Sequence, residues 1–272
     1  MPMLPEHVLE AFSLSGPIQP LSGGTVQVFR VGNLVIKPLN PTALENPHSL
    51  VLAPWLAENF ANLPDQGFRL TRQVPTCENR WLARPNWTAW TVLEGVTPTR
   101  EDIPQIVTAI RALHRAISHL PKHPLLDQND IAWGVAHKYC WREQPPSIHP
   151  QLDGIVKTLY DKLNPLPPME WQLIHGDLSP DNILIAPGKP PGFIDFTPFW
   201  APVDFAIAIF ANFIGPRQDD GSVLPYFDDI PYFDQLLLRV AIRMLLVVSE
   251  LGGVDECQTE RRAAEIVLDY IS

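Results

Sequence analysis

The sequence predicts an α+β fold in two parts: a mainly antiparallel sheet with a helix in residues 1–95, and a mainly helical part in residues 96–272. Three observations predict this division. Up to Gly95, short apolar runs alternate with glycine turns, which is typical of paired strands. After Gly95, apolar residues recur every three or four positions, which is typical of helices. The length of 272 residues is sufficient for two such parts.

The first part is expected to begin with a short helix, to continue with three strands and a longer helix, and to end with further strands. The apolar face formed by Val8, Leu9 and Phe12 predicts the first helix. Gly32-Asn33 is typical of a turn between strands. The predicted elements are a helix over 5–12, strands between 18 and 39, a helix over 49–63, and strands over 68–75, 80–84 and 88–95.

The second part combines amphipathic or strongly apolar helices with one β-hairpin. Residues 183–185 and 192–194 are short apolar runs joined by a Pro- and Gly-rich turn, which favours the hairpin. A short apolar run at 171–174 leads toward it. Helices are predicted over 104–120, 152–163, 203–214 and 232–251.

Composition excludes several classes of protein. The hydrophobic fraction of 46% indicates a globular core, and a net charge of −10 disfavours a nucleic-acid partner. Three separated cysteines fit neither a disulfide framework nor a metal motif. The N-terminus lacks signal-peptide features, and Arg239 and Arg243 interrupt the apolar stretch near the C-terminus. We therefore expect a cytoplasmic protein without a membrane partner.

Two carboxylates and one amide stand at informative spacing. Residues 175–182 read His-Gly-Asp-Leu-Ser-Pro-Asp-Asn, and Asp195 follows the predicted hairpin. Phosphoryl transfer from a nucleotide to a hydroxyl requires one carboxylate that accepts the hydroxyl proton. It also requires oxygen ligands for Mg²⁺, which an amide and a second carboxylate provide. The hairpin would bring Asn182 and Asp195 to one end of a two-stranded ribbon, while Asp177 remains on the preceding loop.

The loop itself is expected to be stiff. Gly176 permits backbone angles that other residues avoid, and Pro180 fixes its own φ while favouring an extended Ser179. Stiffness suits a proton acceptor, because it must stay within hydrogen-bond reach of a substrate hydroxyl.

The segment His175 to Leu184, followed by Gly192-Phe193-Ile194-Asp195-Phe196, resembles the aminoglycoside phosphotransferase and choline kinase family. The resemblance implies a two-lobed protein-kinase-like fold that binds ATP, with GTP as an alternative, between its lobes. It also implies that Asp177 is the catalytic base and that Asn182 and Asp195 hold Mg²⁺. His175 would support the loop rather than react.

Candidate nucleotide residues lie in the first part. Ser22, Gly23 and Gly24 form a candidate phosphate-covering loop, because glycines allow close approach of backbone N–H groups. Lys37 follows an apolar strand, as the phosphate-binding lysine of kinases does. In that pattern it pairs with a helical glutamate; Glu58 is preferred, Glu45 is the alternative, and the spacing settles neither. By the same resemblance, Thr91 to Leu93 would line the base site through the backbone.

The sequence therefore predicts an ATP-dependent phosphotransferase that acts on a hydroxyl of a small molecule. The alternative is a catalytically silent, kinase-like nucleotide-binding protein. A protein kinase is disfavoured, since little chain remains after Asp195 for a long activation segment. A cluster of aspartates between residues 219 and 234 is expected to be a solvated loop; the sharper hypothesis is a rim that attracts a cationic acceptor.

Overall fold

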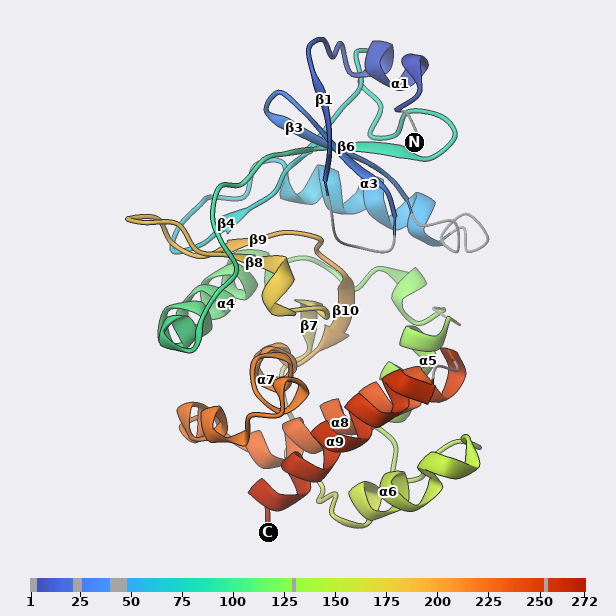
Figure 1. The fold of residues 1–272 in the computed structure, drawn as a ribbon, viewed down its shortest axis with the longest axis vertical. Coiled ribbons are helices and arrows are strands. Elements are labelled where there is room, and N and C mark those ends of the chain that lie inside the picture. The colour runs from blue at the N-terminus through green and yellow to red at the C-terminus, as the bar shows by residue number, and fades with distance from the viewer. Residues whose placement is uncertain (1–3, 22–25, 40–47, 129–130, 252–253) are drawn as a thin grey trace. The chain divides into compact units, whose positions relative to one another are not determined.

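The computed structural model describes residues 4–21, 26–39, 48–128, 131–251 and 254–272. Internal contacts divide the chain into two compact units, Met1–Glu94 and Gly95–Ser272. Figure 1 shows the elements of each unit.

The first unit is built on a five-stranded antiparallel sheet with strand order β1-β2-β3-β6-β5. Residues Gly32 and Asn33 form the turn between β2 and β3, as predicted, and Leu34 of β3 lies opposite Val31 of β2. The elements are α1 (Glu6–Ala11), β1 (Ile18–Leu21), β2 (Val28–Val31), β3 (Leu34–Pro38), α3 (His48–Phe60), β4 (Arg69–Leu70), β5 (Gln73–Val74) and β6 (Trp87–Thr91).

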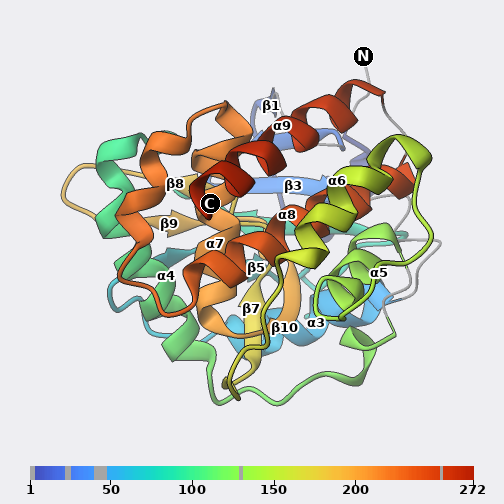
Figure 2. The ribbon, with the colours of Figure 1, turned by 90° about the horizontal axis from the view of Figure 1, so that it is seen from below.

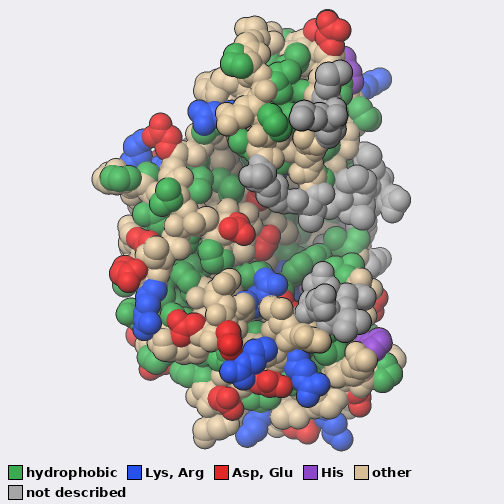
Figure 3. All heavy atoms as spheres, viewed as in Figure 1, with side chains coloured by type: hydrophobic (Ala, Val, Ile, Leu, Met, Phe, Trp, Pro, Cys, Tyr) green, Lys and Arg blue, Asp and Glu red, His purple; other side chains and the backbone are tan. Residues whose placement is uncertain are grey.

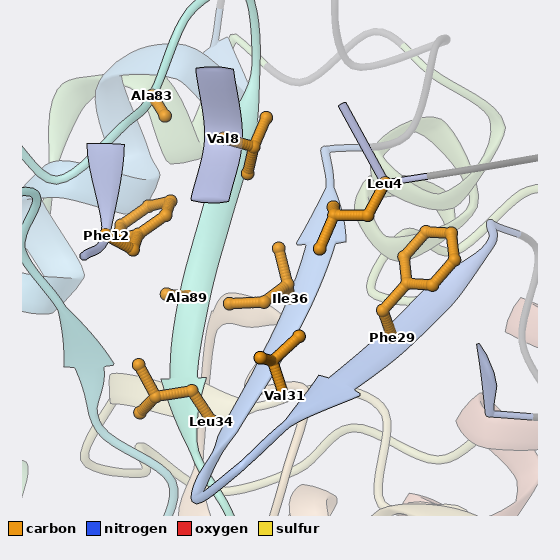
Figure 4. Close-up of a cluster of buried hydrophobic side chains, with 9 residues drawn as sticks. All are labelled: Leu4, Val8, Phe12, Phe29, Val31, Leu34, Ile36, Ala83 and Ala89. Carbon is orange, nitrogen blue, oxygen red and sulfur yellow. The ribbon is translucent and has the colours of Figure 1, made fainter. Parts of the chain in front are cut away.

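One face of this sheet carries the core of the unit. Alternate residues of β2 and β3, with Ala89 of β6, point toward the side chains of α1 (Figure 4). The period-two pattern of burial is what a sheet with one buried face requires. The cluster comprises Leu4, Val8, Phe12, Phe29, Val31, Leu34, Ile36, Ala83 and Ala89.

Two predictions for this unit were wrong. Residues 80–84 do not form a strand: only Ala83 pairs, with Trp87, and the chain reverses between them. The strand predicted over 88–95 ends at Thr91, because the N–H of Val92 turns to donate to the carbonyl of Asn33.

The second unit is mainly helical. Helices α8 and α9 pack side by side (Figures 1 and 2), and nearly all of α8 is buried, which explains its apolar sequence. The α-helices are α4 (Ile103–Ile117), α5 (Ala132–Tyr139), α6 (Pro150–Asp161), α7 (Val203–Ile214), α8 (Phe233–Leu251) and α9 (Val254–Tyr270). Of these, α5 and α9 were not predicted. In the described residues, no helix is long and apolar enough to span a membrane.

Short strands in the second unit position the candidate site. β8 (Ile183–Leu184) and β9 (Gly192–Phe193) form the predicted hairpin, with Ile183 opposite Phe193. β7 (Gln172–His175) pairs antiparallel with β10 (Pro198–Ala201), a strand that was not predicted. The loop that contains Asp177 therefore leaves the end of one strand pair and enters another.

Candidate active site

The loop after β7 is held against β10 at Gly176. The N–H of Gly176 donates to the carbonyl of Thr197 at 2.8 Å. A Cβ at residue 176 would lie only 2.1 Å from Cδ2 of Phe199, on β10. Glycine is needed because the Phe199 ring occupies this space. The backbone of Gly176 has no positive φ, so the predicted reason, unusual backbone angles, was wrong.

The His175 ring links the segments that carry Asp177 and Asp195. Its Nδ1 accepts from the N–H groups of Asp177, at 3.2 Å, and Thr197, at 3.4 Å. Its Nε2 lies 3.1 Å from the carbonyl oxygen of Ile194, which can only accept. These partners fix a neutral ring protonated on Nε2. Burial lowers the pKa of His175 to about 4, so the ring supports the loop without carrying charge.

A second buried histidine supports the first. Nδ1 of His114, on α4, lies 2.7 Å from the carbonyl oxygen of Ile110, and its Nε2 accepts from the N–H of His175 at 3.0 Å. Burial lowers the pKa of His114 to about 4. His114 is thus a packed histidine, and it joins α4 to the end of β7.

Asn182 holds the Asp177 carboxylate. Its Nδ2 donates to Oδ2 of Asp177 at 3.0 Å and to the backbone carbonyl of Asp177 at 2.9 Å. Pro180 begins a single 3₁₀ turn, η3 (Pro180–Asn182), behind an extended Ser179, as predicted. Because the amide nitrogen of Asn182 is engaged by Asp177, its amide oxygen is the atom left for a cation.

The hairpin brings Asp195 to Asn182. The N–H of Ile194 donates to the carbonyl of Asn182 at 3.0 Å, so Asp195 follows directly from this contact. Asp195 is exposed and has φ of 54°, an uncommon value for a non-glycine residue that is often found at functional sites. One amide oxygen and one exposed carboxylate fit the usual protein share of a Mg²⁺ site.

Burial and a neighbouring cation act on the pKa of Asp177 in opposite directions. Loss of water raises this pKa, while the positive charge of Arg243 and the hydrogen bond from Asn182 oppose the rise. Arg243, on α8, is 1% exposed and its Nη2 donates to the carbonyl of Gly176 at 3.0 Å. Its guanidinium lies 4.6 Å from the ring centre of Phe199 and 5.0 Å from that of Trp133. No local sequence pattern indicated that Arg243 contacts the Asp177 loop.

A cavity of about 600 Å³ opens beside Asp177 within the second unit. Its volume is that of a site for a drug-sized molecule. The lining combines acidic, basic and apolar side chains from the Asp177 loop, α5, α7, η4 (Pro216–Gln218), α8 and α9. Asp177 therefore belongs both to the motif at residues 175–182 and to the cavity wall.

The aspartates between residues 219 and 234 do not line this cavity. Asp219 pairs with Arg262 at 2.7 Å, and Asp220 accepts from the N–H of Ser222 at 2.8 Å. Asp228 accepts from Tyr270. On the face seen in Figure 3, acidic and basic side chains are interleaved over the helical unit. The hypothesis of a cation-attracting rim gains no support from this arrangement.

Lys37 lies near the end of β3 in the first unit. Its Nζ lies 5.5 Å from the ring centre of Trp90, and its backbone carbonyl accepts from Thr88 on the adjacent β6. Desolvation lowers the pKa of Lys37 to about 8. Such a lysine gains from an anionic partner, because phosphate oxygens would stabilise its charged form.

The other predicted nucleotide residues have different outcomes. Ser22, Gly23, Gly24 and Glu45 lie outside the described residues. Glu58 is exposed on α3, and its pairing with Lys37 stays a prediction. Thr91 ends β6, with its backbone N–H bonded to Arg72. Leu93 follows the strand and is half-buried.

The profile of the phosphotransferase enzyme family matches residues 18–233. The chain belongs to this family. A search of curated proteins found no match. The family assignment confirms the resemblance read from the motifs at residues 175–196 and indicates a phosphotransferase-type enzyme.

Solved structures confirm the kinase-like fold. One is the amicoumacin kinase hAmiN in complex with AMP-PNP, Ca²⁺ and Ami, with a TM-score of 0.66, 12% identity, and coverage of 97% of this chain and 91% of that one. Another is a thermostable mutant of aminoglycoside phosphotransferase APH(4)-Ia, with a TM-score of 0.65, 15% identity, and coverage of 97% of this chain and 98% of that one. A third is the GDP complex of aminoglycoside 2'-phosphotransferase-IIIa, with a TM-score of 0.58, 14% identity, and coverage of 94% of each chain.

Proposed function

We propose that this chain transfers the γ-phosphoryl group of ATP to a hydroxyl of a small molecule bound in the cavity beside Asp177. One observation carries the proposal: the carboxylate that Asn182 orients also lines a cavity large enough for such a molecule. Among the solved structures of the same fold, one holds AMP-PNP and another holds GDP. These ligands support a nucleotide donor and keep GTP as the alternative to ATP.

Asp177 is assigned the role of proton acceptor. Its carboxylate is held on one side by Asn182, which leaves the other oxygen available to an incoming hydroxyl. Burial raises the pKa of Asp177, which makes it a stronger base than an exposed aspartate, and the charge of Arg243 opposes this rise. Positioning and charge supply most of the catalysis in this type of reaction.

Asn182 and Asp195 are assigned to Mg²⁺, which when bound neutralises charge on the phosphates. Lys37 is assigned to the phosphates, since desolvation lowers its pKa and phosphate oxygens would stabilise its charged form. The backbone of Thr91 to Leu93 is assigned to the nucleotide base. Ser22, Gly23 and Gly24 complete the assignment as the loop over the phosphates.

The proposal is tested by substituting Asp177 with Asn, which keeps the shape of the side chain and removes the base. We expect at least a 10³-fold loss of phosphoryl transfer with an unchanged circular dichroism spectrum, because the residue contributes to chemistry rather than to the core. Asp153→Asn is the control, since Asp153 is exposed on α6 and does not line the cavity. Full activity of Asp177→Asn would overturn the assignment.

A thermal-shift assay with ATP and Mg²⁺, run beside a phosphoryl-transfer assay over a broad panel of alcohols, separates the enzyme from a silent nucleotide-binding protein. Stabilisation accompanied by turnover supports the proposal. Stabilisation without turnover of any alcohol favours the silent alternative.

A further inference from the structure

We infer that the acceptor is an amphipathic alcohol: its apolar part lies on a stripe of α8, and a hydrogen-bond-donating amine binds the buried carboxylate of Glu260. This inference rests on the proposed function, because it describes the molecule whose hydroxyl reaches Asp177. It departs from a polyhydroxylated acceptor, which has no apolar part to place on such a wall.

One wall of the cavity is an apolar stripe. Met244, Val247, Val248 and Leu251 all line it, and their spacing of three, four and seven residues places them on one face of α8. Trp133 of α5 and Phe213 of α7 add aromatic surface. An acceptor with only hydroxyl and amine groups would lose water against this wall without gaining partners, whereas an alkyl or aryl group gains free energy on burial.

The cavity is also lined by a buried carboxylate, that of Glu260, which is 2% exposed. Its Oε1 lies 2.7 Å from Nε of Arg217. Its Oε2 has no hydrogen-bond partner anywhere in the part of the chain that the structure describes. A buried carboxylate oxygen without a partner is costly, and a carboxylate can only accept. A ligand that donates at this oxygen would remove the cost.

Arg217 is held in place beside Glu260 by a tight turn and an aromatic ring. A tight turn at the end of α7 carries it, with the N–H of Gln218 bonded to the carbonyl of Gly215 at 2.7 Å. Its guanidinium lies 4.6 Å from the ring centre of Phe213. Burial raises the pKa of Glu260, and the charge of Arg217 and its contact with Oε1 oppose that rise. Arg217 thus occupies Oε1 and leaves Oε2 for a ligand.

The charge of the lining favours an amine over a neutral donor. Asp177, Asp181 and Glu260 contribute three carboxylates, and Arg217 contributes one cation. The cavity wall thus carries a net negative charge, which stabilises an ammonium group in a partly enclosed site. Asp177 must accept the hydroxyl proton and Asp181 is exposed to solvent, so Glu260 is the buried carboxylate left for the amine.

The test uses aryl-alkyl amino alcohols with two to eight bonds between amine and hydroxyl, each beside its deaminated analogue, and an aminoglycoside that lacks an alkyl or aryl group. Initial rates and calorimetric affinities are measured for the wild-type chain, for Glu260→Gln and for Glu265→Gln. The last variant is the control, because Glu265 lies one helical turn further along α9 and is 43% exposed.

In the wild type we expect at least one amine to exceed its deaminated analogue about tenfold in kcat/KM or affinity. Each added methylene should lower KM roughly threefold to fourfold, which corresponds to about 0.8 kcal/mol. Glu260→Gln should abolish the preference for the amine and leave the neutral analogue within about twofold, while Glu265→Gln should change neither. A preference that survives in Glu260→Gln, or an aminoglycoside favoured over every amphipathic compound, would overturn the inference.

The two proposals fail separately. Absence of turnover with all compounds, together with no effect of ATP on thermal stability, contradicts the proposed function. The calorimetric comparison still decides the acceptor class, because it measures binding of the same pairs without chemistry. If Glu260→Gln does not fold, judged by circular dichroism, the alkyl-length series in the wild type remains decisive: a KM and affinity independent of length refute the inference.

Discussion

His175 and His114 show how neutral side chains position a charged one. Each ring accepts a backbone N–H on one nitrogen and faces a backbone carbonyl with the other. Protonation of either ring would break the accepting contact, and burial opposes the added charge. The loop that carries Asp177 is therefore held by a series of backbone contacts that runs from α4 through His114 and His175.

This series of contacts predicts a loss of stability in mild acid. An unfolded histidine has a pKa near 6.5, and the folded values are about 4, so the unfolded chain binds more protons between these limits. Stability should fall as the pH decreases from 6.5 to 4. His114→Gln keeps an acceptor for the N–H of His175 and should reduce the slope by about 1.4 kcal/mol per pH unit. Urea unfolding at several pH values measures this.

The control for that experiment is His119→Gln, which removes an exposed histidine from the region just after the same helix. It should leave the slope unchanged. An equal slope in wild type and His114→Gln would mean that carboxylates alone produce the acid sensitivity.

Arg243 is predicted to set the protonation of Asp177. Its charge opposes the burial that raises the pKa of Asp177. Arg243→Met fills similar space between two aromatic rings but removes the charge and the hydrogen bond to Gly176. We expect kcat to fall roughly 10- to 100-fold, and the acid limb of the pH–rate profile to move to higher pH, since the raised pKa of Asp177 loses its counteracting charge.

Arg239→Met is the matched comparison. Arg239 lies one turn earlier on α8, where it donates to the carbonyls of Cys140 and Asn164 instead of the Asp177 loop. It should reduce stability without moving the acid limb. An acid limb that does not move in Arg243→Met would leave Arg243 with a packing role only.

At the scale of elements, the pairing of β7 with β10 fixes where the loop begins. Gly176→Ala places a methyl group 2.1 Å from the Phe199 ring, so strand or ring must move. We expect a destabilisation of about 1–3 kcal/mol. The folded variant should also lose activity, because the backbone of Asp177 follows directly and would shift with residue 176. Gly154→Ala, on α6 with no atom within 4 Å of the added Cβ, should be neutral or stabilising. Thermal unfolding and initial rates measure both.

The elements that the sequence predicted are those with a strong local signal. The hairpin at 183–193 has apolar runs and a Pro-Gly turn, and α7 and α8 are strongly apolar. Helix α9 was missed because it is polar on average and buries only a few residues, among them Ala264 and Val267. β10 was missed because its pairing with β7 is non-local, and no period within four residues can reveal it.

The same contrast applies to the candidate site. Asp177, Asn182 and Asp195 stand in a local motif whose spacing is visible in the chain. Glu260 contacts the side chain of Arg217, which lies 43 residues earlier in the sequence. Arg243 donates to the carbonyl of Gly176, which lies 67 residues earlier. In the sequence Arg243 was only an interruption of an apolar stretch, since burial and partners are tertiary properties.

At the scale of the whole molecule, the residues assigned to nucleotide and metal belong to both compact units. Lys37 lies in the first and Asp195 in the second. A ligand that binds the native state alone stabilises it by RT ln(1 + [L]/Kd), which is about 2.7 kcal/mol at one hundred times Kd. ATP with Mg²⁺ should therefore raise the unfolding temperature of both units, and removal of Mg²⁺ with EDTA should reverse most of the shift.

Single substitutions separate the contributions to that shift. Asp195→Asn should abolish the increment that Mg²⁺ adds and retain a smaller shift with ATP alone, because the amide weakens the metal site and leaves Lys37 intact.

Lys37→Met should reduce the shift with ATP whether Mg²⁺ is present or not, since the phosphates lose a cation in either condition. The wild-type shift should also diminish above pH 8, where the unliganded Lys37 loses its proton and the positive charge that attracts phosphate. Differential scanning calorimetry of the three chains with ATP, ATP–Mg²⁺ and buffer measures all of these effects. An ATP–Mg²⁺ shift in Lys37→Met equal to that of the wild type would remove this lysine from the nucleotide site.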